Sequence, residues 1–126
     1  MNSLTYYACF SKYADGGVSV LFPDATCVYT EADTMNEAIR KAKLNLEDLL
    51  IDCAECRQTF YMPSTLEAIE NYYATEYWEL SNDRWENKED RDYVKSLVVS
   101  QEFIPFTVTP PDDSYLDWMI PNPRYK

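Results

Sequence analysis

The chain has 126 residues, 46% of them hydrophobic and 15% aromatic, and it carries a formal net charge of -11 at pH 7. This length suits one domain with a sizeable buried core, and the composition excludes a wholly disordered chain. The negative charge repels phosphate backbones, so direct binding to DNA or RNA is not expected without a local basic patch.

A β-hairpin is predicted near the N-terminus. Residues 5–13 alternate between two faces, as the side chains of a strand do. Asp15-Gly16-Gly17 supplies the turn, because glycine adopts the positive φ that tight turns need. Residues 18–22 form the returning strand, which Pro23 ends because proline cannot donate to a strand ladder.

A long amphipathic helix is predicted after a third, short strand at residues 27–30. Thr34 and Glu37 form a capping box, in which the threonine hydroxyl accepts a bond from a free amide and the glutamate reaches back. The apolar residues that follow share one helical stripe: Met35, Ala38, Ile39, Ala42, Leu46, Leu49, Leu50 and Cys53. Leu44 and Ile51 lie nearly opposite this stripe, either as exposed side chains or as a self-association contact.

The second half of the chain has weaker patterns. Residues 64–67, Ser-Thr-Leu-Glu, are another capping box and predict a helix of roughly two or three turns. Residues 76–92 are acidic and aromatic with weak periodicity, which predicts a loop or short helices within an insertion at about residues 70–93. Residues 94–99 and 103–108 are β-prone, as one long bent strand or as a hairpin.

These elements together predict an α+β fold. The expected order is strand, strand, strand, helix, strand, in an antiparallel sheet with one principal helix packed on one face. The folded domain is expected over residues 1–110, followed by a short proline-rich tail at residues 111–126 without a helix of useful length.

The order of these motifs resembles one known family. The stretch YYACFSKYADGGVSVLFPDATCVYTEADTMNEAIRKAKLNLEDLL resembles the core of HicB-like antitoxins, with an Asp-Gly-Gly hairpin, a Phe-Pro-Asp strand end and a Thr-led helix. MPSTLEAI is similar to the Pro-Ser segment of the family, and FIPFTVTPPDDSYL is similar to its last sheet strand. The resemblance covers more than half of the chain and rests on the order of the motifs.

This resemblance implies a partial ribonuclease-H-like fold without nuclease activity. It also implies a partner, a HicA-like toxin, which is a small basic protein that cuts messenger RNA and whose active surface the antitoxin covers. Most members add a C-terminal segment that dimerises and binds the operator. Residues 111–126 are too few and too rich in proline for such a segment, so operator binding is not expected. A homo-oligomer remains expected, as in the family.

The expected contact surface combines aromatic and acidic side chains. Tyrosine and tryptophan bury large areas at little entropic cost, and carboxylates attract a basic partner and speed its capture. The expected partner contacts are Tyr73, Glu76, Tyr77, Trp78, Glu79, Asp83, Trp85, Glu86, Phe103 and Phe106. The other interpretation is that the tyrosines pack over the open face of the sheet and the carboxylates are only solvated.

No catalytic, cofactor or metal site is predicted. The sequence has no histidine, which excludes catalytic triads and histidine acid–base catalysis. Cys53 and Cys56 lie at the end of a helix, where the dipole disfavours a thiolate. Cys9 and Cys27 are isolated from them in sequence, so neutral thiols are expected rather than a zinc or redox site.

A metal-dependent nuclease would need several carboxylates that converge on paired ions. The candidates lie in turns and at strand ends, with no pattern that forces them together: Asp15, Asp24, Glu31 and Asp33. Turn formation and capping explain most of them, so nuclease activity is not expected.

The sequence therefore predicts a non-enzymatic, HicB-like antitoxin or orphan homologue that occludes a small basic ribonuclease. The alternative is an acidic inhibitor, such as a phage-borne one, of another nucleic-acid-handling protein. The opening residues resemble no secretory signal and no run is long enough to span a bilayer, so a cytoplasmic protein without a membrane partner is expected.

Overall fold

The computed structural model describes residues 3–56, 58–79, 85–110, 113 and 115–125, and these form an α+β fold around a four-stranded antiparallel sheet. The sheet has the order β3-β2-β1-β5 and consists of β1 (Leu4–Tyr13), β2 (Val18–Phe22), β3 (Ala25–Ala32) and β5 (Val98–Val108). Two short strands, β4 (Phe60–Tyr61) and β6 (Met119–Ile120), pair in parallel beside it. The helices are α1 (Met35–Cys56), α2 (Leu66–Thr75), α3 (Lys88–Leu97) and α4 (Tyr115–Trp118).

The predicted hairpin between β1 and β2 is confirmed. Gly16 has a φ of 96°, a left-handed conformation that glycine adopts without steric cost. The amide of Tyr13 donates to the carbonyl oxygen of Gly17 at 2.9 Å, and the amide of Gly17 donates to Asp15 Oδ1 at 2.8 Å. The turn therefore closes through its own backbone and one aspartate.

Helix α1 covers one face of the sheet, as the apolar stripe predicts. Thr34 Oγ1 accepts a hydrogen bond from the amide of Glu37 at 3.2 Å, which caps the first turn. The inward side chains of α1 pack with those of β1, β2 and β5 in the main hydrophobic core. The buried ones are Ala38, Ala42, Leu46, Leu50 and Cys53, and Met35, Ile39 and Leu49 are partly buried at the border of this core.

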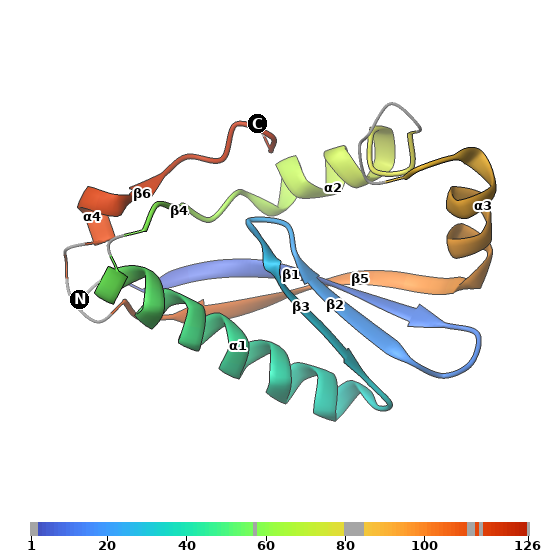
Figure 1. The fold of residues 1–126 in the computed structure, drawn as a ribbon, viewed down its shortest axis with the longest axis horizontal. Coiled ribbons are helices and arrows are strands. Elements are labelled where there is room, and N and C mark those ends of the chain that lie inside the picture. The colour runs from blue at the N-terminus through green and yellow to red at the C-terminus, as the bar shows by residue number, and fades with distance from the viewer. Residues whose placement is uncertain (1–2, 57, 80–84, 111–112, 114, 126) are drawn as a thin grey trace.

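A second helix covers the opposite face, so the expectation of one principal helix on one face is incomplete. Figure 1 shows α1 and α2 on opposite sides of the sheet. On the α2 side, Ile69, Tyr72 and Tyr73 form a smaller core with Cys9 of β1 and Tyr125 near the C-terminus. The tyrosines of α2 thus pack over the sheet face that the sequence left open.

Three details of the second half differ from the sequence prediction. Residues 94–97 form the last turn of α3 and are not β-structure, whereas the strand that follows, β5, is one continuous strand, as in one of the two predicted alternatives. The cap of α2 is Thr65, whose Oγ1 accepts from the amide of Ala68 at 3.2 Å. Ser64, the expected cap, is instead bonded to the side chain of Asp24.

Residues 115–125, which belong to the predicted proline-rich tail, pack against the rest of the domain. Tyr115, Trp118 and Met119 belong to the main core, where each side chain is buried. The hydroxyl of Tyr6 donates to the carbonyl oxygen of Tyr61 at 2.8 Å, on the strand that pairs with β6. Residues 115–119 therefore contribute to the main core, and Tyr125 packs against Tyr72 of α2.

Asp24 links three separate parts of the chain, although its side chain is only 3% exposed. Its carboxylate accepts from the amide of Ser64 at 2.7 Å and from the Ser64 hydroxyl at 2.6 Å. It also accepts from the side-chain amide of Asn122 at 3.0 Å. A buried carboxylate is tolerated when such bonds replace its hydration, so Asp24 fastens the β2–β3 turn to the start of α2 and to the C-terminal segment.

The two edges of the sheet, β3 and β5, differ in their capacity to pair with another strand. On β5, Pro105 lies opposite Tyr7 of β1 without breaking their register. Proline fits an edge strand where the missing N–H would point away from the neighbouring strand, and it then removes a donor from the free edge. Edge β5 is therefore protected against strand pairing, while β3 contains no proline.

We expect Asp24→Ala to lower the free energy of unfolding by about 2–4 kcal/mol, because it leaves buried donors of Ser64 and Asn122 unsatisfied. Urea denaturation followed by circular dichroism measures this loss. Asp48→Ala, at an exposed position of α1, is the matched control and should change stability by no more than about 0.5 kcal/mol. Equal effects of the two variants would contradict the anchoring role of Asp24.

We expect Pro105→Ala to increase self-association, since alanine restores an N–H at the free side of β5. Sedimentation velocity in high salt, which screens the repulsion between acidic chains, measures the change. Thr107→Ala on the same strand leaves the backbone donors unaltered and should remain like the parent chain. Identical sedimentation of both variants would show that Pro105 does not protect this edge.

Candidate protein-binding surface

The acidic and aromatic segment after α2 is held together by ring stacking. The rings of Tyr73 and Tyr77 stack with their centroids 4.2 Å apart, and those of Trp78 and Trp85 stack at 5.2 Å. Trp85 Nε1 donates to the carbonyl oxygen of Tyr77 at 3.0 Å. With Phe103 of β5, these residues form what we call the aromatic cluster.

The aromatic cluster is attached to the sheet through its inner members. Tyr73 is buried and meets Phe103 edge-on, with ring centroids 5.0 Å apart. Tyr77, Trp78 and Trp85 are half-buried, so each keeps part of its ring accessible. Half-exposed tyrosine and tryptophan rings on a fixed base are typical of protein contact surfaces.

Two basic side chains of α3, Arg91 and Lys95, make contacts within this segment. Arg91 Nη1 donates to the carbonyl oxygen of Trp78 at 2.6 Å, and Arg91 Nε pairs with Asp92 at 2.7 Å. The ammonium of Lys95 lies 5.7 Å from the centroid of the Trp78 ring, a cation–π distance. These contacts direct two positive charges inward, toward the aromatic cluster.

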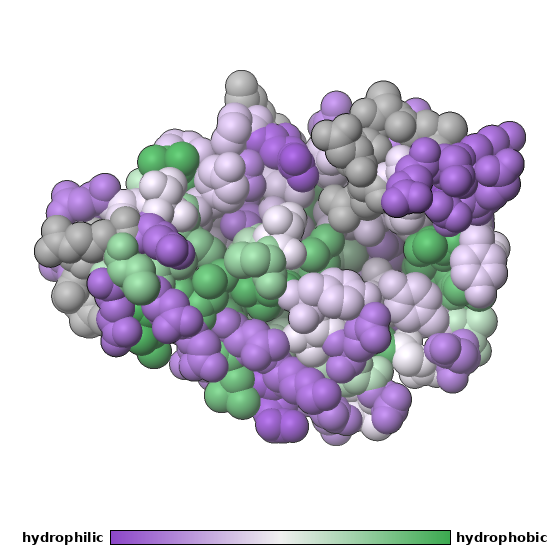
Figure 2. Space-filling model, viewed as in Figure 1, coloured by the Kyte–Doolittle hydropathy of each residue, from purple (hydrophilic) through white to green (hydrophobic). Residues whose placement is uncertain are grey.

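Exposed carboxylates lie beside the members of the aromatic cluster along the chain. This acidic rim consists of Glu76, Glu79, Glu86, Glu89, Asp90 and Asp92. Helix α3 has no buried residue, and Figure 2 shows a hydrophilic area over it at the upper right. Asp83, which is also among the predicted partner contacts, lies outside the described residues. Accessible aromatic rings and exposed carboxylates therefore occur together in residues 76–79 and 85–92, the combination from which a basic partner was predicted.

The remaining predicted contact residues are Phe103 and Phe106 for the partner and Leu44 and Ile51 for self-association, and they differ in burial. Phe106 is 6% exposed and stacks on Phe10 within the main core, so its ring is occupied by packing. Phe103 is half-buried against Tyr73. Leu44 and Ile51, at 50% and 44% exposed, lie on the outer side of α1.

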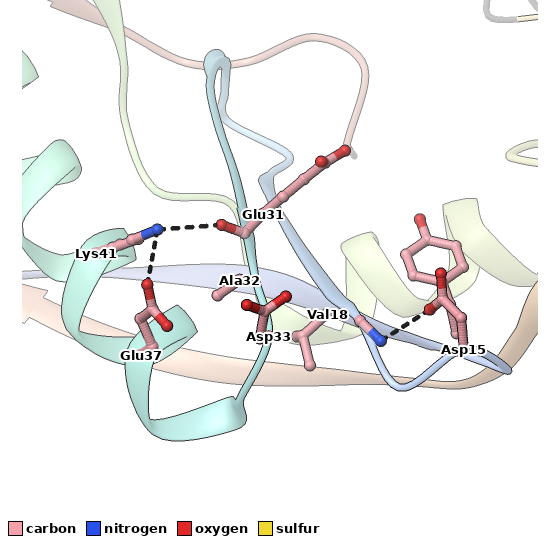
Figure 3. Close-up of a pocket in the computed structure, with 9 residues that line it drawn as sticks. Asp15, Val18, Glu31, Ala32, Asp33, Glu37 and Lys41 are labelled. Atoms are coloured by element: carbon pink, nitrogen blue, oxygen red, sulfur yellow. Dashed lines mark hydrogen bonds and ion pairs between the residues drawn. The ribbon is translucent and has the colours of Figure 1, made fainter.

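A second acidic feature, which sequence reasoning did not assemble, lies between the hairpin turn and the start of α1. This hollow, of about 350 Å³, is lined by the carboxylates of Asp15, Glu31, Asp33 and Glu37 and by Lys41. Figure 3 shows Lys41 directed toward Glu37 and toward the backbone of Glu31. The hydrogen bond and charge of Lys41, at 2.9 Å, lower the pKa of Glu37 below its usual range.

Three of these carboxylates lie between residues 31 and 37, and Asp15 joins them from the hairpin turn between β1 and β2. No spacing within one segment reveals that the hairpin turn comes close to the end of β3. Tyr29 on the adjoining edge donates to Glu31 Oε1 at 2.8 Å. Partial burial, together with this hydrogen bond, raises the pKa of Tyr29 to about 12, so the phenol keeps its proton at neutral pH. Asp24 does not join this group, because it is bonded to Ser64 and Asn122.

The four cysteines differ in their exposure. Cys9 and Cys53 are buried, Cys27 and Cys56 are exposed, and none of the four forms a disulfide bond within the described residues. Burial raises the pKa of Cys53, which keeps it a neutral thiol. Among the described residues, no group of three side chains suited to metal binding occurs. In the same part of the chain, no helix is both long and apolar enough to cross a membrane.

Comparisons with known proteins identify a structural likeness. No protein-family model matches the chain, and no curated protein matches it. Among solved structures, the chain is similar to the crystal structure of the N-terminal domain of Burkholderia pseudomallei antitoxin HicB. The TM-score is 0.52 at 13% sequence identity, and the match covers 84% of this chain and 96% of that chain. The likeness confirms a HicB-like fold.

We expect Trp85→Ala to lower the free energy of unfolding by about 1–2 kcal/mol, because it removes a stacked ring and an N–H bond to the Tyr77 carbonyl. Amide hydrogen exchange should also accelerate in α3. The control is Tyr93→Ala, since Tyr93 is on α3 but 66% exposed. Unchanged stability and exchange in Trp85→Ala would show that the aromatic cluster does not hold the segment in place.

Proposed function

We propose that this chain is a HicB-like antitoxin or an orphan homologue, which binds a small basic HicA-like toxin and occludes its messenger-RNA-cutting surface. It acts by binding alone and catalyses no reaction. The observation that carries this proposal is the structural likeness to the N-terminal domain of a HicB antitoxin, which extends over 96% of that domain.

The charge of the chain supports a basic partner. Twenty-two acidic residues against eleven basic ones give the net charge of -11. Such a surface attracts a basic protein at long range and speeds encounter at low salt. It opposes binding to operator DNA, which is itself anionic.

The aromatic cluster and acidic rim supply the contact that the proposal requires. The half-buried rings of Tyr77, Trp78 and Trp85 would bury apolar area against the partner, while Glu76, Glu79 and Glu86 would pair with its basic side chains. Tyr73 supports this surface from beneath, since it is buried. Self-association through Leu44 and Ile51 remains a prediction for the same domain.

The proposal predicts that co-expression of this chain restores growth to cells that express the small basic toxin encoded beside its gene. Combined charge reversal at Glu76, Glu79 and Glu86 should slow association of the purified proteins at low salt, and the effect should fade as salt rises. Surface plasmon resonance measures the association rate. A partner that is not a ribonuclease, recovered by pull-down from the native host, would contradict the antitoxin role.

The matched control reverses Glu47, Glu55 and Glu70, which are exposed and lie outside the acidic rim. Each triple reversal adds six charges to -11 and leaves -5, so overall charge is equal in the two variants. Equal association rates for the two variants would remove the acidic rim from the contact surface and leave only a general effect of charge.

A further inference from the structure

The free side of β3 carries backbone groups directed away from the sheet. Lys41 Nζ lies 3.4 Å from the carbonyl oxygen of Glu31, which places this oxygen on the side away from β2. Backbone groups of alternate residues in an antiparallel strand point to the same side. The N–H and C=O of Tyr29 therefore also point outward, on a strand of eight residues without proline.

The strand itself contains no proline and no lysine, although Lys41 of α1 contacts one outward carbonyl oxygen, that of Glu31. Edge strands are protected by proline, by lysine, by bulges or by a covering element. Among the described residues, no strand pairs with β3 on its outer side. Its one register shift falls between the pairs Leu21–Tyr29 and Phe22–Ala25, so residues 29–32 keep a regular register with β2. The other edge, β5, has Pro105 in the corresponding outward position.

Negative charge flanks this edge on the α1 side. A hollow of about 280 Å³ between β3 and α1 is lined by Asn45, Asp48 and Asp52 of the helix and by Tyr29 of the strand. Beyond the other end of the strand lies the acidic hollow of Asp15, Asp33 and Glu37. A strand added beside β3 would direct alternate side chains toward α1 and toward the tyrosine side of the sheet.

These groups disfavour a second copy of the chain as the added strand. Pairing β3 with its own copy would bring two sets of Asp48 and Asp52 together between chains that each carry a charge of -11. A strand whose lysine or arginine side chains face α1 would instead neutralise these carboxylates. The ring of Tyr29, which is 52% exposed, offers apolar contact to the alternate side chains.

We propose that β3 is a docking edge for an extended segment of a protein partner, in which basic side chains alternate with apolar ones. The segment adds a fifth strand to the sheet through the outward backbone groups of Tyr29 and Glu31. This inference goes beyond the proposed function, because it concerns a different surface and applies to any partner with such a segment.

The test uses an end-capped peptide of about eight residues that alternates lysine with valine. We expect saturable binding that weakens as salt rises and that slows hydrogen exchange at the amides of Tyr29 and Glu31. Calorimetry and exchange measured by NMR report these quantities. The same peptide with glutamate in place of lysine should not bind.

Variants separate strand addition from simple charge attraction. Tyr29→Pro removes an outward N–H and should weaken peptide binding about tenfold, while Thr107→Pro on the opposite edge should leave it unchanged. Asp48→Lys with Asp52→Lys should weaken binding without altering the strand, and Glu47→Lys with Glu55→Lys is its charge-matched control.

The proposal is overturned by absence of binding, by binding without slowed exchange in β3, or by equal effects of the two charge-reversal pairs. Concentration-dependent slowing of exchange in β3 without peptide would identify a second copy as the occupant and would also overturn it. The peptide experiment uses no toxin. A negative result would therefore overturn the docking edge without counting against the proposed antitoxin role.

Discussion

The fold depends on one buried carboxylate. Asp24 is enclosed where the β2–β3 turn, the start of α2 and the C-terminal segment meet, and its oxygens accept bonds from Ser64 and Asn122. A buried carboxylate without partners would be strongly unfavourable, so these three segments must come together for Asp24 to be accommodated. The same site affects Tyr6, whose pKa is raised by burial and further by the charge of Asp24. Tyr6 therefore remains a hydrogen-bond donor to the Tyr61 carbonyl.

This anchor explains why two distant motifs belong together. Phe-Pro-Asp ends β2 and Pro-Ser precedes α2, and the structure joins them through the bonds between Asp24 and Ser64. Ser64 is thereby unavailable as a cap, and Thr65 takes that role one residue later. Once α2 is placed over the second face of the sheet, its tyrosines meet Cys9 and Phe103, and the aromatic cluster continues from its C-terminal end.

With both faces of the sheet covered, contact with other molecules is left to the borders of the fold. The aromatic cluster and acidic rim lie at the end of α2 and along α3, whereas β3 forms a free edge beside α1. Both places combine tyrosine or tryptophan with carboxylates, which accords with the excess of acidic residues over basic ones. Both proposed contact surfaces therefore depend on the same excess of acidic residues and on where the fold leaves aromatic rings exposed.

The sequence by itself determined the elements whose cause is local. Adjacent glycines fix the hairpin turn, Pro23 ends β2, and Thr34 with the apolar stripe fixes α1, because each depends on neighbours a few residues away. Only the tertiary structure decided the rest. Residues 94–97 are β-prone yet continue α3, a helix that Asn87 caps and whose Arg91 and Lys95 contact Trp78. The burial of Asp24, the packing of Phe106 and the convergence of carboxylates near Lys41 depend on segments far apart in the chain, and no spacing within one segment encodes such contacts.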